Sequence, residues 1–478
     1  MDPETSSNSQ YGRRDFFRTA TAAAIGAIGA SAVGARADAP EPLHTTIAKA
    51  GEIPPRKFKD VVGLTTKPLE TVRIGIIGVG ARGGTHLHTL LNLAKVDPER
   101  KVEIAAICDI DKAATERAAS AVEKATGKKP QTFTNGENDF QNLCKLDNLD
   151  VVYVITPWEW HVPMALCAMD HGKHAIIEVP CAVTVAECWE LVNKAEETRL
   201  HCMMTENCTY GSEEMMVLNM VRNGLLGELI HGEGAYLHNL RSILASGKSE
   251  GTWRWKHHVN RNGNTYPTHG LGPITQYMSI GRTEDQFASI VSVSSKERSL
   301  SLYVEDHGAA DNPIKKAKFT GGDMNISILK TVAGRTIMVQ HDVVNPRPYD
   351  RLNLISGTKG AFCGYPSRLF VDGQKEDEWQ QGDDVLLFKE YQHPLWKSIG
   401  EAAKKSGGHG GMDFIMTYRL IECLNKGLPL DINVYESVAW SAVSELSELS
   451  VANGGAPVVF PDFTRGAWKT AAPLGIVG

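Results

Sequence analysis

The chain has 478 residues, of which 42% are hydrophobic and 22% charged, and its formal net charge is -6. This length gives room for two or more domains, and the composition is typical of a soluble globular protein. A net negative charge supplies no basic surface, which argues against nucleic acid as a partner. The nine cysteines include no Cys-x-x-Cys pair, so we interpret them as buried thiols and not as disulfides or metal ligands.

The N-terminus has the features of an export signal. Arg13 and Arg14 precede an Ala/Gly-rich run over residues 19–34, and small-x-small cleavage sites follow that end at Ala37 or Ala39. This order resembles a twin-arginine signal, a route that exports folded proteins, and it predicts a periplasmic or secreted protein without a stable membrane anchor. The alternative is a disordered basic tail with an alanine-rich helix.

An apolar, β-branched run over residues 72–77 ends in a glycine turn, after which a helical pattern begins. The turn carries Gly78, Gly80 and Gly83. In a dinucleotide-binding turn the first glycine allows the tight bend, the second lets the backbone approach a pyrophosphate, and the third lets helix and strand pack closely. The anion then binds unpaired N–H groups of the helix. We therefore predict a dinucleotide site with Arg82 and Gly83 at its pyrophosphate end.

A second predicted strand over residues 101–108 ends at Asp109. A carboxylate there is placed to accept hydrogen bonds from ribose hydroxyls and to repel a 2′-phosphate, which favours NAD over NADP. Gly78 and Asp109 are 31 positions apart, against a usual spacing of about 20. We assign the surplus to an extended helix-to-strand connection over residues 92–100. Asp109 as a turn or cap residue is the alternative.

A third strand over residues 150–155 leads into a polar and aromatic stretch that contains Trp158 and His161. This stretch falls at the carboxyl edge of the sheet, where open α/β sheets bind their ligands, so both side chains are expected to line the nicotinamide side. The alternative makes Trp158 a packing residue and His161 a helix cap.

The alternation of strands and helices continues to residue 206 and then changes to a β-rich pattern. We predict an α/β fold with a signal peptide at 1–39, an N-terminal arm at 40–70, a Rossmann dinucleotide-binding domain at 71–206 and an α+β domain at 207–478. The second domain is expected to hold a large, mostly antiparallel sheet, with helices at 412–425 and 435–452 folding back between the domains. One sheet face would carry the substrate site and the other would pair with a second subunit. The remaining predicted strands of the first domain are 173–177 and 200–205, and those of the second are 228–238, 287–294, 324–331, 336–341, 351–355 and 361–365.

Four motifs, in chain order, resemble those of the Gfo/Idh/MocA oxidoreductase superfamily. They are Gly-x-Gly-x-Arg-Gly, Cys-Asp-Ile-Asp, Thr-Pro-x-x-x-His and Glu-x-Pro. In many members a lysine at the middle position of the last motif assists hydride transfer. Here Val179 occupies that position, between Glu178 and Pro180, which argues against a plain sugar dehydrogenase.

Motifs in the later half resemble those of the NAD-dependent glycoside hydrolases of family 109, whose type activity is α-N-acetylgalactosaminidase. These motifs surround Asn207 and Tyr210, Arg254, the stretch from Tyr266 to His269, and Tyr349, and the resemblance extends to residues 460–466. It implies hydrolysis of terminal N-acetylgalactosamine from a glycan or glycoside. Oxidation at C3 by NAD acidifies the C2 proton, elimination and water addition follow, and the hydride returns to C3, so that NAD is recycled.

The resemblance also implies residue roles. His269 and Tyr266 lie three positions apart at a helix start, and we expect them to transfer the proton at C3. Tyr210 and Tyr349 would bind the sugar and are candidates for the C2 base or the leaving-group acid, while Arg254 would hold ring hydroxyls or the acetamido carbonyl. The alternatives are a loop aromatic for Tyr349, a cation–π contact for Arg254 and a helix cap for His269.

The glycine turn and the resemblance together assign the contacts with NAD. These are expected at Gly78, Gly80, Arg82, Gly83, Asp109, Trp158, His161, Glu178, Val179, Asn207 and Tyr266. His257, His258 and the glycine-rich stretch around His409 lack acidic or cysteine partners at ligand spacing, so we interpret them as loop structure and expect no metal. Asp413 is interpreted as an acid favoured by the helix dipole. Two other hypotheses stay open, a sugar dehydrogenase of the same fold and a noncatalytic sugar- or nucleotide-binding protein.

Overall fold

A computed structural model of the chain describes residues 50–309, 311–374, 378–382, 385–406 and 408–476. The stretch Leu43–Gly478 forms one compact unit. The expected export signal lies outside the described residues. Across the ranges just given, no helix combines the length and the apolar character needed to cross a membrane.

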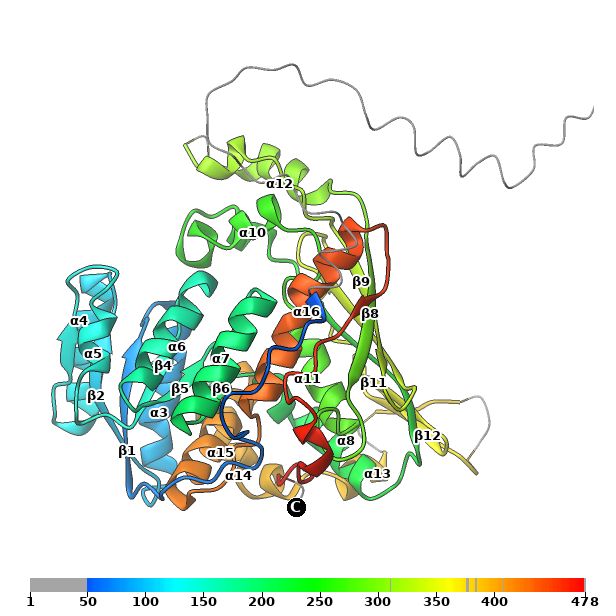
Figure 1. Cartoon of the computed structure of the whole chain (residues 1–478), viewed down its shortest axis with the longest axis horizontal. Coiled ribbons are helices and arrows are strands. Elements are labelled where there is room, and N and C mark those ends of the chain that lie inside the picture. The colour runs from blue at the N-terminus through cyan, green and yellow to red at the C-terminus, as the bar shows by residue number, and fades with distance from the viewer. Residues whose placement is uncertain (1–49, 310, 375–377, 383–384, 407, 477–478) are drawn as a thin grey trace, which may run out of the picture. The chain divides into compact units, whose positions relative to one another are not determined.

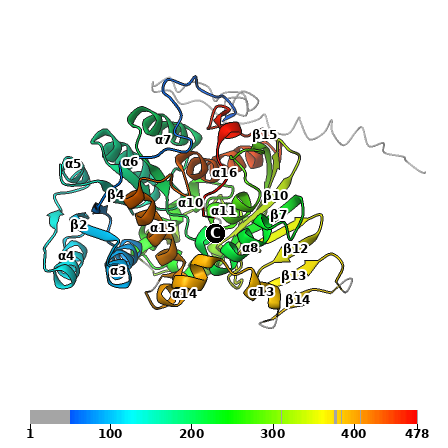
Figure 2. The ribbon, with the colours of Figure 1, turned by 90° about the horizontal axis from the view of Figure 1, so that it is seen from below.

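The first sheet has six parallel strands in the order β3-β2-β1-β4-β5-β6. Figure 2 shows α6 and α7 on one side of this sheet and α3 and α15 (Met412–Lys426) on the other. Because helices cover both faces, the central strands are buried along nearly their whole length. The predicted Rossmann architecture is confirmed. Its elements are β1 (Thr71–Ile77), α3 (Ala81–Val96), β2 (Lys101–Cys108), α4 (Lys112–Thr126), β3 (Gln131–Phe133), α5 (Phe140–Cys144), β4 (Val151–Val154), α6 (His161–Asp170), β5 (His174–Ile177), α7 (Val185–Thr198) and β6 (Cys202–Met204).

The connection expected over residues 92–100 is wrong in its first half, because α3 continues to Val96. Leu90 and Leu93 are almost completely buried, so the apolar face of the helix extends through this region. Only four residues, 97–100, connect α3 to β2. The long spacing between Gly78 and Asp109 therefore reflects a long helix.

The second sheet has nine strands in the order β14-β13-β12-β11-β7-β10-β9-β8-β15. Its pairs are antiparallel except β7 with β10, which confirms the predicted mostly antiparallel sheet. The strand expected at 351–355 begins later, because Leu352 and Asn353 have left-handed backbone angles (φ 60° and 48°) that no regular strand accommodates. The strands are β7 (Leu229–Leu237), β8 (Phe287–Ser294), β9 (Asn325–Thr331), β10 (Thr336–Asp342), β11 (Leu354–Gly357), β12 (Gly360–Cys363), β13 (Arg368–Val371), β14 (Gln380–Gln381) and β15 (Val458–Val459).

Two helices pack on the nine-stranded sheet, and one of them also contacts the Rossmann domain. In Figure 1, α16 (Val434–Ala452) passes between the two sheets, packing on α7 and on β8, while α11 (Thr268–Tyr277) lies on β7. The α11–β7 approach depends on glycine, since a Cβ on Gly270 would lie 2.3 Å from the backbone nitrogen of Ala235. The other helices are α8 (Ser212–Arg222), α9 (Arg241–Leu244), α10 (Trp255–Asn260), α12 (Ser299–His307), α13 (Leu386–Glu390), α14 (Pro394–Ser406) and α15 (Met412–Lys426).

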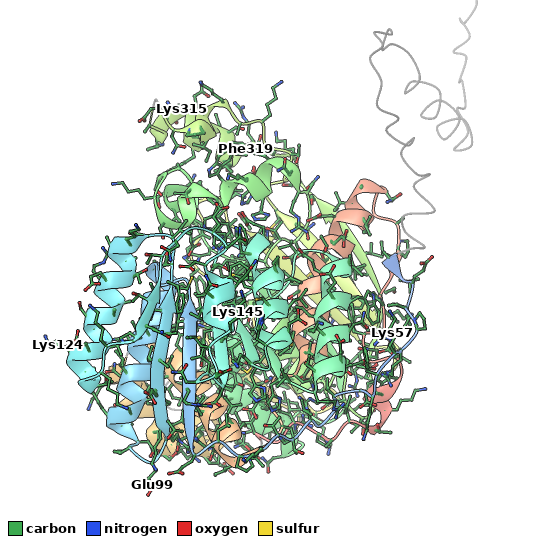
Figure 3. The ribbon with its side chains drawn as sticks, turned by 60° about the vertical axis from the view of Figure 1, so that its left-hand side comes forward. Lys57, Glu99, Lys124, Lys145, Lys315 and Phe319 are labelled. Carbon is green, nitrogen blue, oxygen red and sulfur yellow. The ribbon has the colours of Figure 1, made fainter. Side chains whose placement is uncertain are left out.

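The carboxyl edge of the parallel sheet faces the segments around α10 and α12. In Figure 3, Glu99, which shortly precedes β2, lies at one end of the strands, and Lys315 and Phe319, which follow α12, lie beyond the other end. Figure 1 places α10 at that same end. Loops that leave the parallel strands thus meet side chains of the second half of the chain.

Candidate active site

The turn after β1 leaves no room for side chains at two of its three glycines. Gly78 has φ 87°, and a Cβ there would lie 2.1 Å from the carbonyl oxygen of Ile155; a Cβ on Gly83 would lie 2.0 Å from the carbonyl oxygen of Gly78. Gly80 faces open space and is the N-cap of α3, with no side-chain cap hydrogen bond. The first N–H groups of α3 are therefore available to an anion, as a pyrophosphate requires.

Asp109 lies at the mouth of this turn. Its Oδ2 accepts a hydrogen bond from the Val79 N–H (2.8 Å) and its Oδ1 one from the Asp111 N–H (2.9 Å). Asp111, and not Asp109, caps α4 through bonds to the next helical N–H groups. Each carboxylate oxygen of Asp109 keeps a lone pair for a ribose hydroxyl. The glycine turn and this carboxylate fit NAD.

The side chain of Arg82 is held between two buried carboxylates. Its Nε donates to Glu178 Oε1 (2.7 Å) and its Nη1 to Asp413 Oδ2 (2.8 Å), and His86 Nε2 lies 2.7 Å from the same Glu178 oxygen. Burial alone raises the pKa of Glu178, but the charge of Arg82 and the hydrogen bonds from His86 and from the Val179 N–H hold it far below its usual value. The Arg82 guanidinium thus joins α3 to β5 and α15.

Asp413 is the second centre of this charge network. It lies in the first turn of α15, as the helix-dipole interpretation requires, and it also accepts hydrogen bonds from Asn207 Nδ2 (2.7 Å) and His409 Nδ1 (2.9 Å). Burial raises its pKa, whereas the bonds from His409 and Arg82 hold it far below its usual value. Asn207 and Glu178, both expected to touch NAD, are bonded into this network.

His161 is fully buried and has no ring nitrogen free for a cofactor. Its Nδ1 lies 2.7 Å from the carbonyl oxygen of Pro180 and its Nε2 2.8 Å from that of Thr156. Both partners are carbonyl oxygens in the loops that follow β4 and β5, so the ring joins these two loops, and the helix-cap alternative is not supported because no side-chain cap hydrogen bond is present at the start of α6. Val179 is also buried, and its N–H donates to the Glu178 carboxylate (2.9 Å). Trp158, in contrast, stacks on Tyr266 with ring centroids 5.7 Å apart.

Three of the expected sugar-site residues gather around Tyr236, a residue that sequence reasoning missed. Tyr266 and His269 have ring centroids 5.0 Å apart, and Tyr236 lies 4.8 Å from Tyr266, 5.3 Å from His269 and 6.1 Å from Tyr349. We call Tyr236, Tyr266, His269 and Tyr349 the aromatic cluster. The signal for Tyr236 was its place near the carboxyl end of the predicted strand 228–238.

His238 extends this cluster and was missed as well. It follows Tyr236 by two positions, so both side chains point to the same side of β7. The Tyr236 hydroxyl lies 2.9 Å from His238 Nδ1, and the His238 ring lies 4.9 Å from that of Tyr349. Burial, followed by the positive charge of Arg254, lowers the pKa of His238. A neutral imidazole is thus available at the open side of the cluster.

His269 is bonded to a buried carboxylate. Its Nδ1 lies 2.9 Å from Oε1 and 2.8 Å from Oε2 of Glu206, whose side chain is fully buried. Cys208 Sγ joins these donor atoms within 4.8 Å, a spacing that also suits a metal ion. A metal would have to displace the hydrogen bond between His269 and Glu206, and the expectation of no metal stays a prediction.

Arg254 makes cation–π contacts, which the sequence analysis gave as the alternative to a sugar contact. Its guanidinium lies 4.7 Å from the Tyr266 ring and 5.3 Å from that of Trp158, and its Nη1 donates to Glu250 Oε2 (2.6 Å). These contacts hold a positive charge against the aromatic cluster. A hydroxyl or carbonyl of a sugar bound there would meet that charge.

Tyr210 is not brought to the cluster. Its phenol is buried in the core, where its hydroxyl donates to Asp431 Oδ2 (3.4 Å) near Arg419. The short helical turn Cys208–Tyr210 directs the ring inward, so the expected contact with sugar has no geometric support. Tyr349, by contrast, is 39% exposed, and its hydroxyl accepts a hydrogen bond from Arg351 Nη1 (2.9 Å).

Both halves of the chain match models of known protein families. Residues 72–206 match the family model described as oxidoreductase family, NAD-binding Rossmann fold, and residues 210–470 match the model described as glycosyl hydrolase 109, C-terminal domain. Among solved structures, levoglucosan dehydrogenase in complex with NADH and levoglucosan shares the fold, with a TM-score of 0.64 at 17% identity over 82% of this chain and 100% of that chain.

Full-length relatives agree with the family models. A glycosyl hydrolase family 109 protein of Solibacter usitatus is 50% identical over 420 residues, which cover 87% of this chain and 93% of the relative. A family 109 protein of Akkermansia muciniphila is 48% identical and covers 94% of this chain and 96% of its own length. The chain therefore belongs to glycosyl hydrolase family 109, and it is a glycoside hydrolase built on an NAD-binding Rossmann domain.

Proposed function

We propose that this protein hydrolyses terminal N-acetylgalactosamine residues of glycans or glycosides by way of a 3-keto sugar. When bound, NAD+ supplies the hydride acceptor for C3 and gives the hydride back after water has added, so no nucleotide is consumed. The protein's part is to orient the sugar against the nicotinamide, to move protons at O3, at C2 and at the leaving oxygen, and to exclude bulk water.

His269 and Tyr266 are proposed to take the proton from the C3 hydroxyl. Their rings are in contact, and an imidazole titrates near neutrality, which suits a group that accepts and returns a proton in each turnover. They are proposed to take over the proton transfer that a lysine at position 179 would perform, since this chain has Val179 there. Arg254 is proposed to hold a ring hydroxyl or the acetamido carbonyl through its charge.

Tyr349 is proposed as the acid for the leaving oxygen. Its hydroxyl accepts a hydrogen bond from Arg351 Nη1 (2.9 Å), so its own proton stays free to be donated to a leaving oxygen. A protonated group suits an acid better than the C2 base. Its partial exposure places it where a leaving group can depart.

The observation that carries this proposal is the aromatic cluster itself. Ordinary glycosidases place two carboxylates on either side of the scissile bond. The carboxylates in contact with this site, Glu206 and Glu250, are bonded to His269 and Arg254. Proton transfer by tyrosine and histidine beside a nucleotide site supports oxidation and elimination over direct displacement.

The test is hydrolysis of p-nitrophenyl α-N-acetylgalactosaminide without added NAD, in heavy water. We expect nitrophenol release and deuterium at C2 of the product, together with NAD in the supernatant of the heat-denatured protein. Release without deuterium at C2 would contradict the elimination route. NADH accumulation with free sugar and added NAD would identify a dehydrogenase, and binding without either product a noncatalytic protein.

Two further proposals follow from sequence and surface. We propose export by the twin-arginine route, which replacement of Arg13 and Arg14 by lysine would block in a cell-fractionation assay.

We also propose self-association through the outer face of the nine-stranded sheet, where Val293 and Ile328 are about half exposed on neighbouring strands. Ile328→Lys is expected to lower the molar mass measured by light scattering.

A further inference from the structure

Glu206 is an unusual residue for its place in the fold. It follows β6 at the carboxyl edge of the parallel sheet, its side chain is fully buried, and it lies against α11. A Cβ on Gly272 of α11 would come within 3.1 Å of Glu206 Cγ, so the glycine leaves room for the glutamate. A buried carboxylate is costly unless it is paired, and its partners therefore show what it does.

Its hydrogen bonds are directed at His269. Both carboxylate oxygens lie within 2.9 Å of His269 Nδ1, and the Cys208 N–H donates to Oε1 (2.9 Å). Burial raises the pKa of Glu206, but the interaction with His269 and the hydrogen bond from the Cys208 N–H lower it below its usual value. Glu206 is thus an ionised acceptor for the Nδ1 proton.

We infer that Glu206 is the positioning residue for His269. By accepting the Nδ1–H bond it holds the imidazole in the tautomer whose Nε2 lone pair is free, and it stabilises the imidazolium that forms when Nε2 takes a proton. The arrangement of base and carboxylate is the one used by hydrolases with a Ser-His-Asp triad, here on a different fold and with a sugar hydroxyl as the proton donor. The inference rests on the proposed role of His269 at C3.

The test compares three glutamate variants. Glu206→Gln keeps the shape, but its amide can donate to Nδ1 and so stabilise the wrong tautomer; Glu206→Asp restores the carboxylate. The control is Glu196→Gln, another buried glutamate, which is bonded to Tyr435 (2.8 Å) and Arg465 (3.0 Å) and not to the aromatic cluster. Each variant is assayed for kcat, KM, melting temperature and NAD released per chain.

We expect Glu206→Gln to lower kcat by about 10²- to 10⁴-fold, with KM within about threefold and NAD content unchanged. Glu206→Asp should recover at least a tenth of the activity, and Glu196→Gln should lower only the melting temperature. In a His269→Ala background, Glu206→Gln should cause no further loss, because the two residues act as a unit.

A kcat for Glu206→Gln within about threefold of the wild type would overturn the inference. So would a loss that Glu196→Gln reproduces, or one that persists at full size in the His269→Ala background, since both indicate a purely structural role. If the unmodified protein releases no nitrophenol, the proposed function fails first, a result distinct from an active protein that tolerates Glu206→Gln.

Discussion

The nucleotide side of the site and the proposed sugar side differ in the kinds of chemical group that line them. The nucleotide side consists of backbone N–H groups and a closed charge network in which Arg82 is bonded to Glu178 and Asp413. The proposed sugar side is a set of aromatic rings around Tyr236, with Tyr349 partly exposed to solvent. Buried ion pairs resist rearrangement because separating them leaves an unpaired charge. A rigid cradle suits a retained cofactor, and an open aromatic surface suits a ligand that exchanges in every turnover.

The largest effect is expected on the sugar side, from His269→Ala. Removing the imidazole leaves only the Tyr266 phenol, a much poorer proton acceptor at neutral pH, so kcat should fall by about 10²- to 10⁴-fold. The nucleotide side is untouched, and the NAD content of the heat-denatured protein should equal that of the wild type. Undiminished turnover, or NAD loss in parallel with activity, would contradict the division between the two sides.

On the nucleotide side, the glycine turn offers a matched pair of variants. A Cβ on Gly83 would overlap the Gly78 carbonyl, so Gly83→Ala should lower the free energy of unfolding by about 1–3 kcal/mol and abolish NAD binding. A Cβ on Gly80 meets no protein atom within 4 Å. Gly80→Ala should therefore keep the melting temperature and lose NAD affinity.

Calorimetry and NAD titration of the two variants separate folding from cofactor binding. Normal NAD affinity in Gly80→Ala would show that the pyrophosphate does not approach this position.

A smaller effect is expected from Tyr349 and Tyr210, to which the sequence analysis assigns the same roles at the sugar. Tyr349→Phe removes the hydroxyl bonded to Arg351 and should lower kcat about tenfold for a poor leaving group, with less effect for p-nitrophenol. Tyr210→Phe removes a hydroxyl that faces Asp431 in the core, and activity should stay within about twofold. A reversed order would return Tyr210 to the sugar site. Initial rates with alkyl and nitrophenyl glycosides provide the measurement.

The acid stability of the nucleotide side is expected to depend on two carboxylates. The pKa values of Glu178 and Asp413 lie far below their usual values in the folded protein, so their contribution is present above about pH 4.5 and is lost as the pH falls through the folded values. Below pH 4 the unfolded chain binds protons that the folded chain does not. The free energy of unfolding should then fall by about 1.4 kcal/mol per pH unit for each carboxylate.

Urea unfolding between pH 3 and pH 5 measures this slope. Asp413→Asn should reduce this slope by the contribution of one carboxylate, about 1.4 kcal/mol per pH unit. An unchanged slope would mean that Asp413 is not held ionised in the folded protein.

Much of the fold was predictable because it depends on local patterns. The strand over residues 101–108 and the helix that begins at Met412 were placed to the residue or nearly so, since runs of β-branched residues and apolar periodicity are properties of a short stretch of chain. The proximity of Tyr266 and His269 was predictable for the same reason, because three positions separate them. The end of α3 was not predictable in this way, because polar residues near its last turn obscure the apolar pattern that continues to Leu93.

The sequence by itself determined the strand–turn–helix of the nucleotide site and the residue types available for proton transfer. Tertiary structure alone decided which of them meet. Asp413 reaches Arg82 across 331 positions, and Glu206 reaches His269 across 63. Tyr236 becomes the centre of the cluster because α11 packs on β7, and Tyr210 turns into the core, where it meets Asp431. Such contacts depend on the packing of distant segments, and neither local propensity nor motif spacing encodes that packing directly.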